Sequence, residues 1–184
     1  SLLFAFERLG RNAELTTDPS TIRQAERVLL PGVGAAKDAM ERLADAKLIE
    51  VIRELEQPVL GICLGMQLLF EGSEEEDVEC LGIVPGVAAE LNVSPEFPVP
   101  NMGWCATRST PDDDLFAGIA DDSFFYYLHS YALPVSDRTI AVAEHSRPFS
   151  AAIRYKNFVA TQFHPERSSA AGARLLKNFL GSDQ

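Results

Sequence analysis

The sequence is short of cysteine, of histidine and of basic side chains. Its three cysteines, Cys63, Cys80 and Cys105, are an odd number and include no Cys-x-x-Cys pair. This argues against a disulfide framework and against a thiolate zinc site. Neither a metal nor a cofactor is expected. The natural compartment for such a chain is the reducing cytoplasm, where a thiol can serve as a nucleophile.

Basic residues are outnumbered, with 16 Lys and Arg against 27 Asp and Glu, and the net charge is -11. A nucleic-acid binder gains affinity by neutralising phosphates with Lys and Arg, so this class is disfavoured. The charge favours a partner with a basic docking face. No apolar run approaches the ~20 residues that span a bilayer, and residues 1–8 lack the basic flank and small-residue cleavage site of a signal peptide.

The 184 residues, 46% of them hydrophobic, suit one domain over residues 1–184. Helices are expected at 2–9, from Pro19 onward, over 40–55, at 64–71 and at 169–180, and strands at 27–30, 58–62, 123–131, 139–144, 151–155 and 158–163. Residues 72–79, which are strongly acidic, and residues 94–100, with three prolines, are expected to be loops. This order predicts an α/β fold with a mostly parallel central sheet flanked by helices, plus antiparallel strands.

The sharpest local feature is Gly61-Ile62-Cys63-Leu64-Gly65, where an apolar strand meets a helix. Glycines two residues to each side allow a tight turn that exposes the sulfur above the carboxyl end of the sheet. The helix N–H groups then favour a thiolate and can hold an oxyanion. A cysteine between apolar residues is equally well explained as a small buried hydrophobe, so a catalytic interpretation needs a base.

Phe163-His164-Pro165-Glu166 supplies a candidate base at the end of a later strand. If the chain stays extended, His164 and Glu166 point to one side, and the carboxylate can orient the imidazole. Cys63 and His164 lie about a hundred residues apart and meet only through the fold. A capping histidine beside a surface glutamate is the alternative for this pair alone, but the pair and the elbow together favour nucleophilic catalysis.

Five segments, in order along the chain, resemble the class I (triad) glutamine amidotransferases, and among them the branch that serves histidine biosynthesis. They are Pro31-Gly32-Val33-Gly34, the cysteine elbow, Met102-Gly103-Trp104, His129-Ser130-Tyr131-Ala132 and Gln162-Phe163-His164-Pro165-Glu166-Arg167. The resemblance implies the flavodoxin-like fold of that family. It also implies hydrolysis of L-glutamine to glutamate and ammonia through a cysteine thioester.

The resemblance assigns a role to each group of residues. The catalytic residues are Cys63, His164 and Glu166; the oxyanion hole is formed by Val33 and Leu64; the substrate-binding residues are Gly32, Gly34, Gln67, His129, Ser130 and Tyr131; the partner-interface residues are Asn101, Met102, Trp104 and Arg167. The implied partner is a cyclase with the fold of a (β/α)8 barrel, which forms a heterodimer with the glutaminase and receives its ammonia. Nucleic acid and membrane are not expected as partners.

Three features depart from the family's pattern. The family usually opens with a strand before its first helix, whereas this chain begins inside that helix, so the expected sheet lacks its first strand. Cys105 stands where the family commonly has Asn, and Asn101 also differs from the usual residue. Both lie in the segment expected to face the cyclase, so the details of the interface are the part left open.

Other functions share some of these features. A class I glutaminase of another synthase is the nearest alternative, but Leu64, Met66 and the Trp104 segment favour the histidine branch. A non-catalytic regulatory docking subunit would have lost Cys63, His164 or Glu166, and all three are present. A third alternative is a γ-glutamyl peptidase or a chaperone-like protein of similar fold, which hydrolysis of γ-glutamyl peptides without a partner would indicate.

Overall fold

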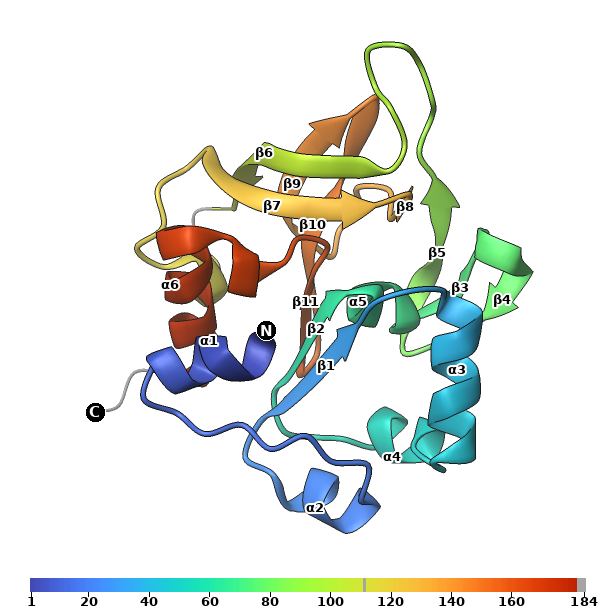
Figure 1. The fold of residues 1–184 in the computed structure, drawn as a ribbon, viewed down its shortest axis with the longest axis vertical. Helices are drawn as coiled ribbons and strands as arrows, with labels where there is room; N and C mark the ends of the chain where they lie inside the picture. Colours follow the sequence, from blue (N-terminus) through green and yellow to red (C-terminus); the bar gives the residue numbers. More distant parts are fainter. Residues whose placement is uncertain (111, 182–184) are drawn as a thin grey trace.

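Helices and strands alternate in the first half of the chain, and strands dominate the second half (Figure 1). The structure, a computed structural model, describes residues 1–110 and 112–181. Its helices are α1 (Leu2–Arg8), α2 (Pro19–Gln24), α3 (Ala36–Asp45), α4 (Ile49–Arg53), α5 (Leu64–Leu68) and α6 (Ser169–Leu180), and its 3-10 turns are η1 (Glu75–Asp77), η2 (Asp114–Phe116) and η3 (Pro165–Arg167). Its strands are β1 (Val28–Gly32), β2 (Val59–Cys63), β3 (Phe70–Ser73), β4 (Val78–Glu79), β5 (Val84–Glu90), β6 (Asn101–Ser109), β7 (Ser123–His129), β8 (Tyr131–Ala132), β9 (Thr139–His145), β10 (Arg147–Tyr155) and β11 (Phe158–Thr161). Within the described ranges, no helix has the length and apolar character needed to cross a bilayer.

Seven strands form the main sheet in the order β1-β2-β11-β10-β9-β6-β7, and four form a smaller sheet in the order β4-β3-β5-β8. In the main sheet, β2 runs parallel to both β1 and β11, whereas β11-β10, β10-β9, β9-β6 and β6-β7 are antiparallel pairs. The α/β fold is confirmed, but the parallel part of its sheet is smaller than expected. The two-residue turn Lys156-Asn157 explains part of this difference, because so short a connection can join only antiparallel strands.

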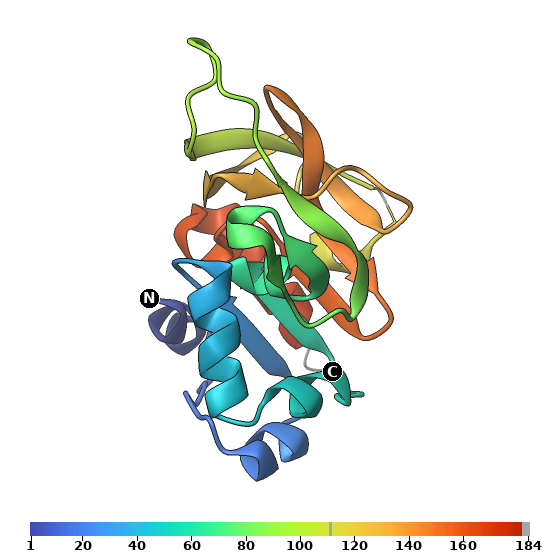
Figure 2. The same cartoon turned by 90° about the vertical axis from the view of Figure 1, so that its right-hand side faces the viewer.

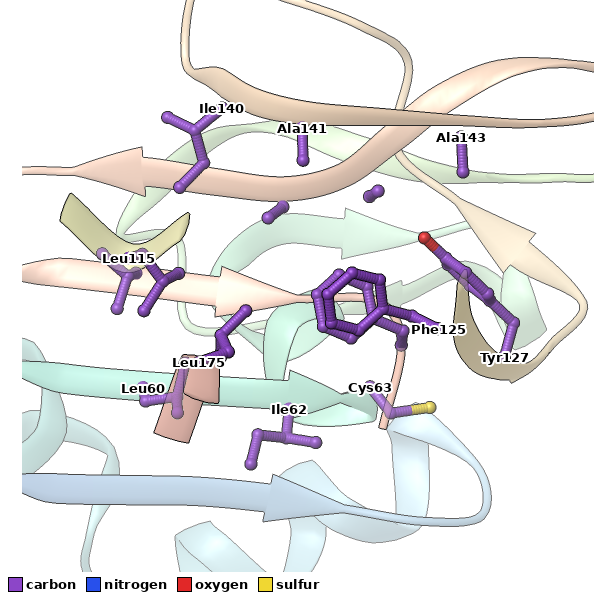
Figure 3. Close-up of a cluster of buried hydrophobic side chains, with 14 of the residues drawn as sticks. Leu60, Ile62, Cys63, Leu115, Phe125, Tyr127, Ile140, Ala141, Ala143 and Leu175 are labelled. Atoms are coloured by element: carbon purple, nitrogen blue, oxygen red, sulfur yellow. The ribbon is translucent and has the colours of Figure 1, made fainter. Parts of the chain in front are cut away.

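Helices cover both faces of the parallel half of the sheet, with α1 and α6 on one side and α3 on the other (Figure 2). β2 lies between two hydrophobic cores, and all five of its residues are buried. Leu60 and Ile62 belong to the core shared with α1 and α6, whereas Val59 belongs to the other core, as the two-residue period of a strand requires. Cys63 lies at the end of this strand, at the edge of the first core (Figure 3).

The single helix expected over residues 40–55 is wrong, because the structure has two helices there. α3 ends in a Schellman motif, in which the Leu48 N–H donates to Leu43 O at 2.9 Å and the Lys47 N–H donates to Ala44 O at 3.0 Å. Lys47 adopts a left-handed φ of 58° at this point. The chain therefore turns, and α4 begins in a new direction although its apolar residues continue the spacing of α3.

Two expectations between residues 64 and 79 are also wrong. The helix expected over 64–71 ends at Leu68, and Phe70 begins β3. The acidic segment 72–79 is not a loop throughout: Gly72 and Ser73 are buried and pair with Glu79 and Val78, with η1 between the two strands. The segment belongs to the smaller sheet because β3 also pairs with β5, a strand that the sequence did not indicate.

Elements with a clear end signal are confirmed. Asp18 caps α2, since its carboxylate accepts a hydrogen bond from the Thr21 N–H at 2.8 Å. The C-terminal helix α6, the hairpin of β10 and β11, and the irregular segment 94–100 all occur where the sequence predicted them. The strand expected at 27–30 continues to Gly32, whereas β6 was not predicted.

Candidate active site

Cys63 occupies a tight turn between a strand and a helix, as the elbow motif predicted. It is the last residue of β2 and the N-cap of α5. Its φ of 54° and ψ of −111° lie in a region that side chains other than glycine rarely adopt. Such strain is typical of a nucleophile presented on an elbow. Cys63 is largely buried, with 7% of the residue exposed, and it lines a cavity.

The glycines around Cys63 are required by close packing. A Cβ on Gly65 would lie 1.8 Å from the Leu30 carbonyl oxygen, which no side chain can tolerate. A Cβ on Gly61 would lie 2.9 Å from Gly65 O, and one on Gly32 would lie 3.0 Å from Gly65 N. Gly32 is also in register with Cys63 between β1 and β2. The Gly32-Val33-Gly34 segment therefore follows directly from the edge of the sheet at the elbow.

His164 and Glu166 form a hydrogen-bonded pair beside Cys63. The Nδ1 of His164 lies 2.8 Å from Oε1 of Glu166, and both side chains are largely buried, at 7% and 13% exposed. An extended chain was expected here, but Pro165–Arg167 forms the 3-10 turn η3. The turn still directs the carboxylate at the ring, so the structure brings Cys63, His164 and Glu166 together.

The surroundings of His164 favour its charged form. Burial lowers the pKa of His164, but its hydrogen bonds to Cys63 and Glu166, together with the negative charge on both partners, outweigh burial and raise the pKa to about 9. An imidazolium beside the sulfur favours a thiolate and can donate a proton to a leaving group.

The backbone around His164 is held by three further hydrogen bonds. The His164 N–H donates to Tyr126 O at 2.9 Å, and the Ser168 hydroxyl donates to His164 O at 2.6 Å. The Tyr126 N–H in turn donates to Ser168 Oγ at 2.9 Å. These bonds fix η3 against β7 and so hold the backbone from which the imidazole projects.

A cavity of about 250 Å³ opens above Cys63. Its walls include most of the residues proposed for the oxyanion hole and for the substrate: Val33, Gly34, Leu64, Gln67, His129, Ser130 and Tyr131, with His164 and Arg167. Gly32 is absent from this set because it lies beneath the elbow. The cavity also includes Glu75, Pro100 and Leu128, for which the sequence indicated no role.

Gln67 presents a defined atom to the cavity. Its Nε2 donates to Tyr131 O at 3.0 Å and to Oε1 of Gln162 at 3.1 Å, so both amide hydrogens are directed at protein acceptors. The Gln67 Oε1 is therefore the group that can accept a hydrogen bond from a substrate.

His129 supports the cavity wall from behind. Its Nδ1 lies 2.9 Å from Tyr131 O, which can only accept, so Nδ1 carries the hydrogen and Nε2 accepts from the Asn101 amide at 3.0 Å. Burial lowers the pKa of His129 to about 4, so the ring is neutral near pH 7. Both ring nitrogens are thus hydrogen-bonded within the protein, to Tyr131 O and to the Asn101 amide, and these bonds fix the segment from Ser130 to Tyr131.

Glu75 is the functional candidate that sequence reasoning missed. One of its carboxylate oxygens accepts a hydrogen bond from the Ala36 N–H at 3.0 Å, at the start of α3, and the side chain lines the cavity. In the sequence it is one acid among several in the segment 72–79, and nothing singles it out. Its position depends on the pairing of β3 with β4 and β5.

The residues proposed for the partner interface divide between the surface and the interior. Met102 and Trp104 are 67% and 51% exposed, on the outward face of β6. Arg167 lines the cavity and lies over the Tyr126 ring at 4.4 Å, and Trp104 contacts the same ring. Asn101 is only 4% exposed, so any effect it has on a partner is indirect, through His129.

Cys80 and Cys105 differ from Cys63 in their surroundings. Burial, with the charge of Glu75, raises the pKa of Cys80 to about 11. Burial also raises the pKa of Cys105, against a hydrogen bond from Asn101. Both thiols are poor nucleophiles in this state. In the part of the chain that the structure describes, no group of three or more His, Cys, Asp or Glu side chains could hold a metal ion.

Comparison with known families agrees with this geometry. The family model described as glutamine amidotransferase class-I matches residues 7–182. The chain belongs to this family. Solved structures support the same fold: a protein from Thermoplasma acidophilum, described as part of a GMP synthase, has a TM-score of 0.71 at 20% identity, with 98% of this chain and 85% of that chain covered. A second structure, described as a glutamine amidotransferase, has a TM-score of 0.71 at 16% identity, with 96% and 89% covered.

Curated relatives indicate which group within this family the chain belongs to. The imidazole glycerol phosphate synthase subunit HisH of Vibrio cholerae serotype O1 is 48% identical over 186 residues, which covers 98% of this chain and 91% of the relative. The protein of the same name from Mannheimia succiniciproducens is 50% identical over 180 residues, covering 98% and 92%. Within the class-I family, the chain belongs to the group of HisH subunits.

Proposed function

We propose that this chain is the glutaminase subunit of imidazole glycerol phosphate synthase in histidine biosynthesis. It hydrolyses L-glutamine to glutamate and ammonia and passes the ammonia to a cyclase with the fold of a (β/α)8 barrel, in a cytoplasmic heterodimer. The observation that carries this proposal is the cavity of about 250 Å³ lined by Cys63 and His164, with the largely buried Glu166 hydrogen-bonded to His164. The identity to HisH subunits supports the choice of synthase.

The reaction follows from the roles of three side chains. The Cys63 thiolate attacks the side-chain amide carbon of glutamine and forms a tetrahedral oxyanion, held by the backbone N–H groups of Leu64 and Val33. Collapse of this intermediate breaks the C–N bond, and His164 gives its proton to the departing ammonia. Water then attacks the γ-glutamyl thioester while neutral His164 takes its proton, which releases glutamate and restores the thiolate–imidazolium pair.

The amino-acid head of glutamine is recognised by groups on the other walls of the cavity. The carboxylate of Glu75 and the Oε1 of Gln67 are acceptors suited to an α-ammonium group. The segment of Ser130 and Tyr131, fixed by His129, faces the α-carboxylate. Replacement of Glu75 by Gln is expected to raise KM for glutamine about tenfold or more, since a charged hydrogen bond is lost.

The outward face of β6 and β7 is the surface proposed for the cyclase. Met102, Trp104, Phe124 and Leu128 are exposed apolar side chains on these two paired strands. Leu128 and Arg167 also line the cavity, so this surface reaches the place where ammonia forms. Exposed apolar side chains gathered beside a catalytic cavity are typical of a docking surface.

The test is glutamate release by the isolated chain and by the chain mixed with a cyclase, with and without the cyclase's nucleotide ligand. The chain alone is expected to be weakly active, and the complex with ligand strongly active. Cys63→Ala is the matched control and is expected to be inactive in both states. Full activity without a cyclase, unchanged when one is added, would instead indicate a stand-alone hydrolase.

A further inference from the structure

Gln162 lies directly behind the Cys63 sulfur, and the glutaminase reaction as proposed gives it no role. It is completely buried, at 0% exposed. Its side-chain Oε1 lies 3.1 Å from Nε2 of Gln67, and its Nε2 lies 3.8 Å from Sγ of Cys63. A buried amide is costly unless it is hydrogen-bonded, so these two contacts explain how a polar side chain is accommodated here.

The chain of hydrogen bonds decides which end of the amide faces the sulfur. The Tyr131 carbonyl oxygen only accepts, so the Gln67 atom 3.0 Å from it is the amide nitrogen. That nitrogen donates its second hydrogen to Gln162, which therefore presents its oxygen to Gln67 and its nitrogen to Cys63. A reversed Gln162 would place two N–H donors against each other.

Besides His164, the sulfur has two polar neighbours of opposite character. The Leu128 carbonyl oxygen, 3.6 Å from Sγ, accepts a hydrogen bond from the thiol and has none to offer the thiolate. The Gln162 Nε2 donates, and a donor stabilises the charged sulfur more than the neutral one. Gln162 therefore acts on the form of Cys63 that carries out the attack.

We propose that Gln162 is a further catalytic residue, a buried donor that stabilises the Cys63 thiolate and is oriented by Gln67. The proposal deepens the glutaminase function and rests on Cys63 being its nucleophile. It also links the substrate to the sulfur. The Gln67 amide, which faces the cavity, is hydrogen-bonded to Gln162, and Gln162 is in turn hydrogen-bonded to Cys63.

Several titratable groups surround the sulfur and have to be kept constant in any test. His164 is hydrogen-bonded to Cys63, with Glu166 behind it, and the rest of the cavity wall contributes Glu75, His129, Tyr131 and Arg167. None of these is altered by a substitution at residue 162, so a change in the pH dependence of the thiol follows from the loss of the amide donor.

The experiment measures the rate at which iodoacetamide alkylates Cys63 as a function of pH, with the modified peptide identified by mass spectrometry. Gln162→Met keeps the side-chain volume and removes the donor; Gln162→Glu keeps the shape and the acceptor for Gln67 but places a carboxylate at the sulfur. The control is Gln57→Leu, which removes another amide side chain with two contacts, to Ile22 O and Arg23 O, away from the cavity.

The Met variant is expected to move the midpoint of the alkylation profile upward by about one pH unit, which is a roughly tenfold change in the equilibrium between thiol and thiolate. The Glu variant is expected to move it further, and the Gln57 control not at all. With a cyclase present, kcat for the Met variant is expected to fall about tenfold with little change in KM.

A midpoint left unchanged by both substitutions at residue 162 would overturn the proposal, and so would an equal shift in the Gln57 control. Melting temperatures measured in parallel identify a variant that fails to fold, in which case the Glu variant, which keeps the bond to Gln67, decides. Absence of glutamate release from the unaltered chain with a cyclase would refute the proposed function alone, because the alkylation profile does not depend on turnover.

Discussion

Replacement of Glu166 by Gln tests the central electrostatic feature of the site. The substitution keeps the size of the side chain and an oxygen near Nδ1 of His164, 2.8 Å away in the unaltered chain, but removes the negative charge. Although burial acts in the opposite direction, bonds to Cys63 and Glu166 raise the pKa of His164 from 6.5 to about 9. This shift corresponds to roughly 3 kcal/mol, of which the carboxylate contributes on the order of half.

The sign of the effect on stability follows from this shift. A histidine whose folded pKa exceeds its unfolded value stabilises the protein fully below the unfolded pKa, near 6.5, and the contribution is lost as pH rises through about 9. In Glu166→Gln the folded pKa is lower, so the contribution is smaller. The difference in unfolding free energy between the two chains is expected to shrink by about 1–2 kcal/mol between roughly pH 6 and pH 10.

Three measurements check this prediction. Urea denaturation at several pH values gives the stability difference, and NMR titration of the His164 imidazole gives its pKa directly. Glutamate release in the presence of a cyclase gives the activity, which is expected to fall about 10²-fold, less than in His164→Ala, where the proposed proton donor itself is lost. An unchanged His164 pKa in the Gln variant would refute the electrostatic argument, and equal inactivity of the two variants would show that the carboxylate does more than orient the ring.

A glutamine analogue with an electrophile at the amide carbon is expected to label Cys63 and spare Cys80 and Cys105, whose pKa values burial raises; labelling of either of those in peptide mass spectrometry would contradict the assignment. Gly65→Ala is expected to lower the melting temperature strongly or prevent folding, because its Cβ would lie 1.8 Å from Leu30 O. A variant that melts like the unaltered chain would show that the elbow can relax. A cyclase with its ligand is expected to raise glutamate release by at least about 10²–10³-fold, the loss seen when one oxyanion donor is removed. Because the net charge is -11, high salt is expected to weaken the association with a cyclase whose docking face is basic. Binding titrations at two salt concentrations check this.

What could be predicted from the sequence was local or carried by a motif. The elbow at Cys63, the pairing of His164 with Glu166 and the helix α6 each have a signal within a few residues of the chain, and each is present in the structure. Their catalytic roles are still proposals, but the geometry that those roles require was correctly placed.

What could not be predicted depends on contacts between distant segments. Glu75 reaches the cavity because β3 pairs with β5, and the acidic segment gives no hint of this pairing. The Gln162 side chain owes its orientation to Gln67 and Tyr131, 95 and about thirty residues away in the chain. The break between α3 and α4 at Lys47 was not predicted, because the spacing of apolar residues gives no sign of a left-handed backbone at a residue other than glycine.

The position of β11 has a consequence for folding. β11 lies between β2 and β10, with Thr161 opposite Ile62, so the chain reaches His164 only after this late strand has inserted beside the one that ends at Cys63. Pairings between segments so far apart in sequence form slowly, because a large loop must close first. If His164 is the acid of the reaction as proposed, a chain in which β11 has not yet paired with β2 is expected to release no glutamate.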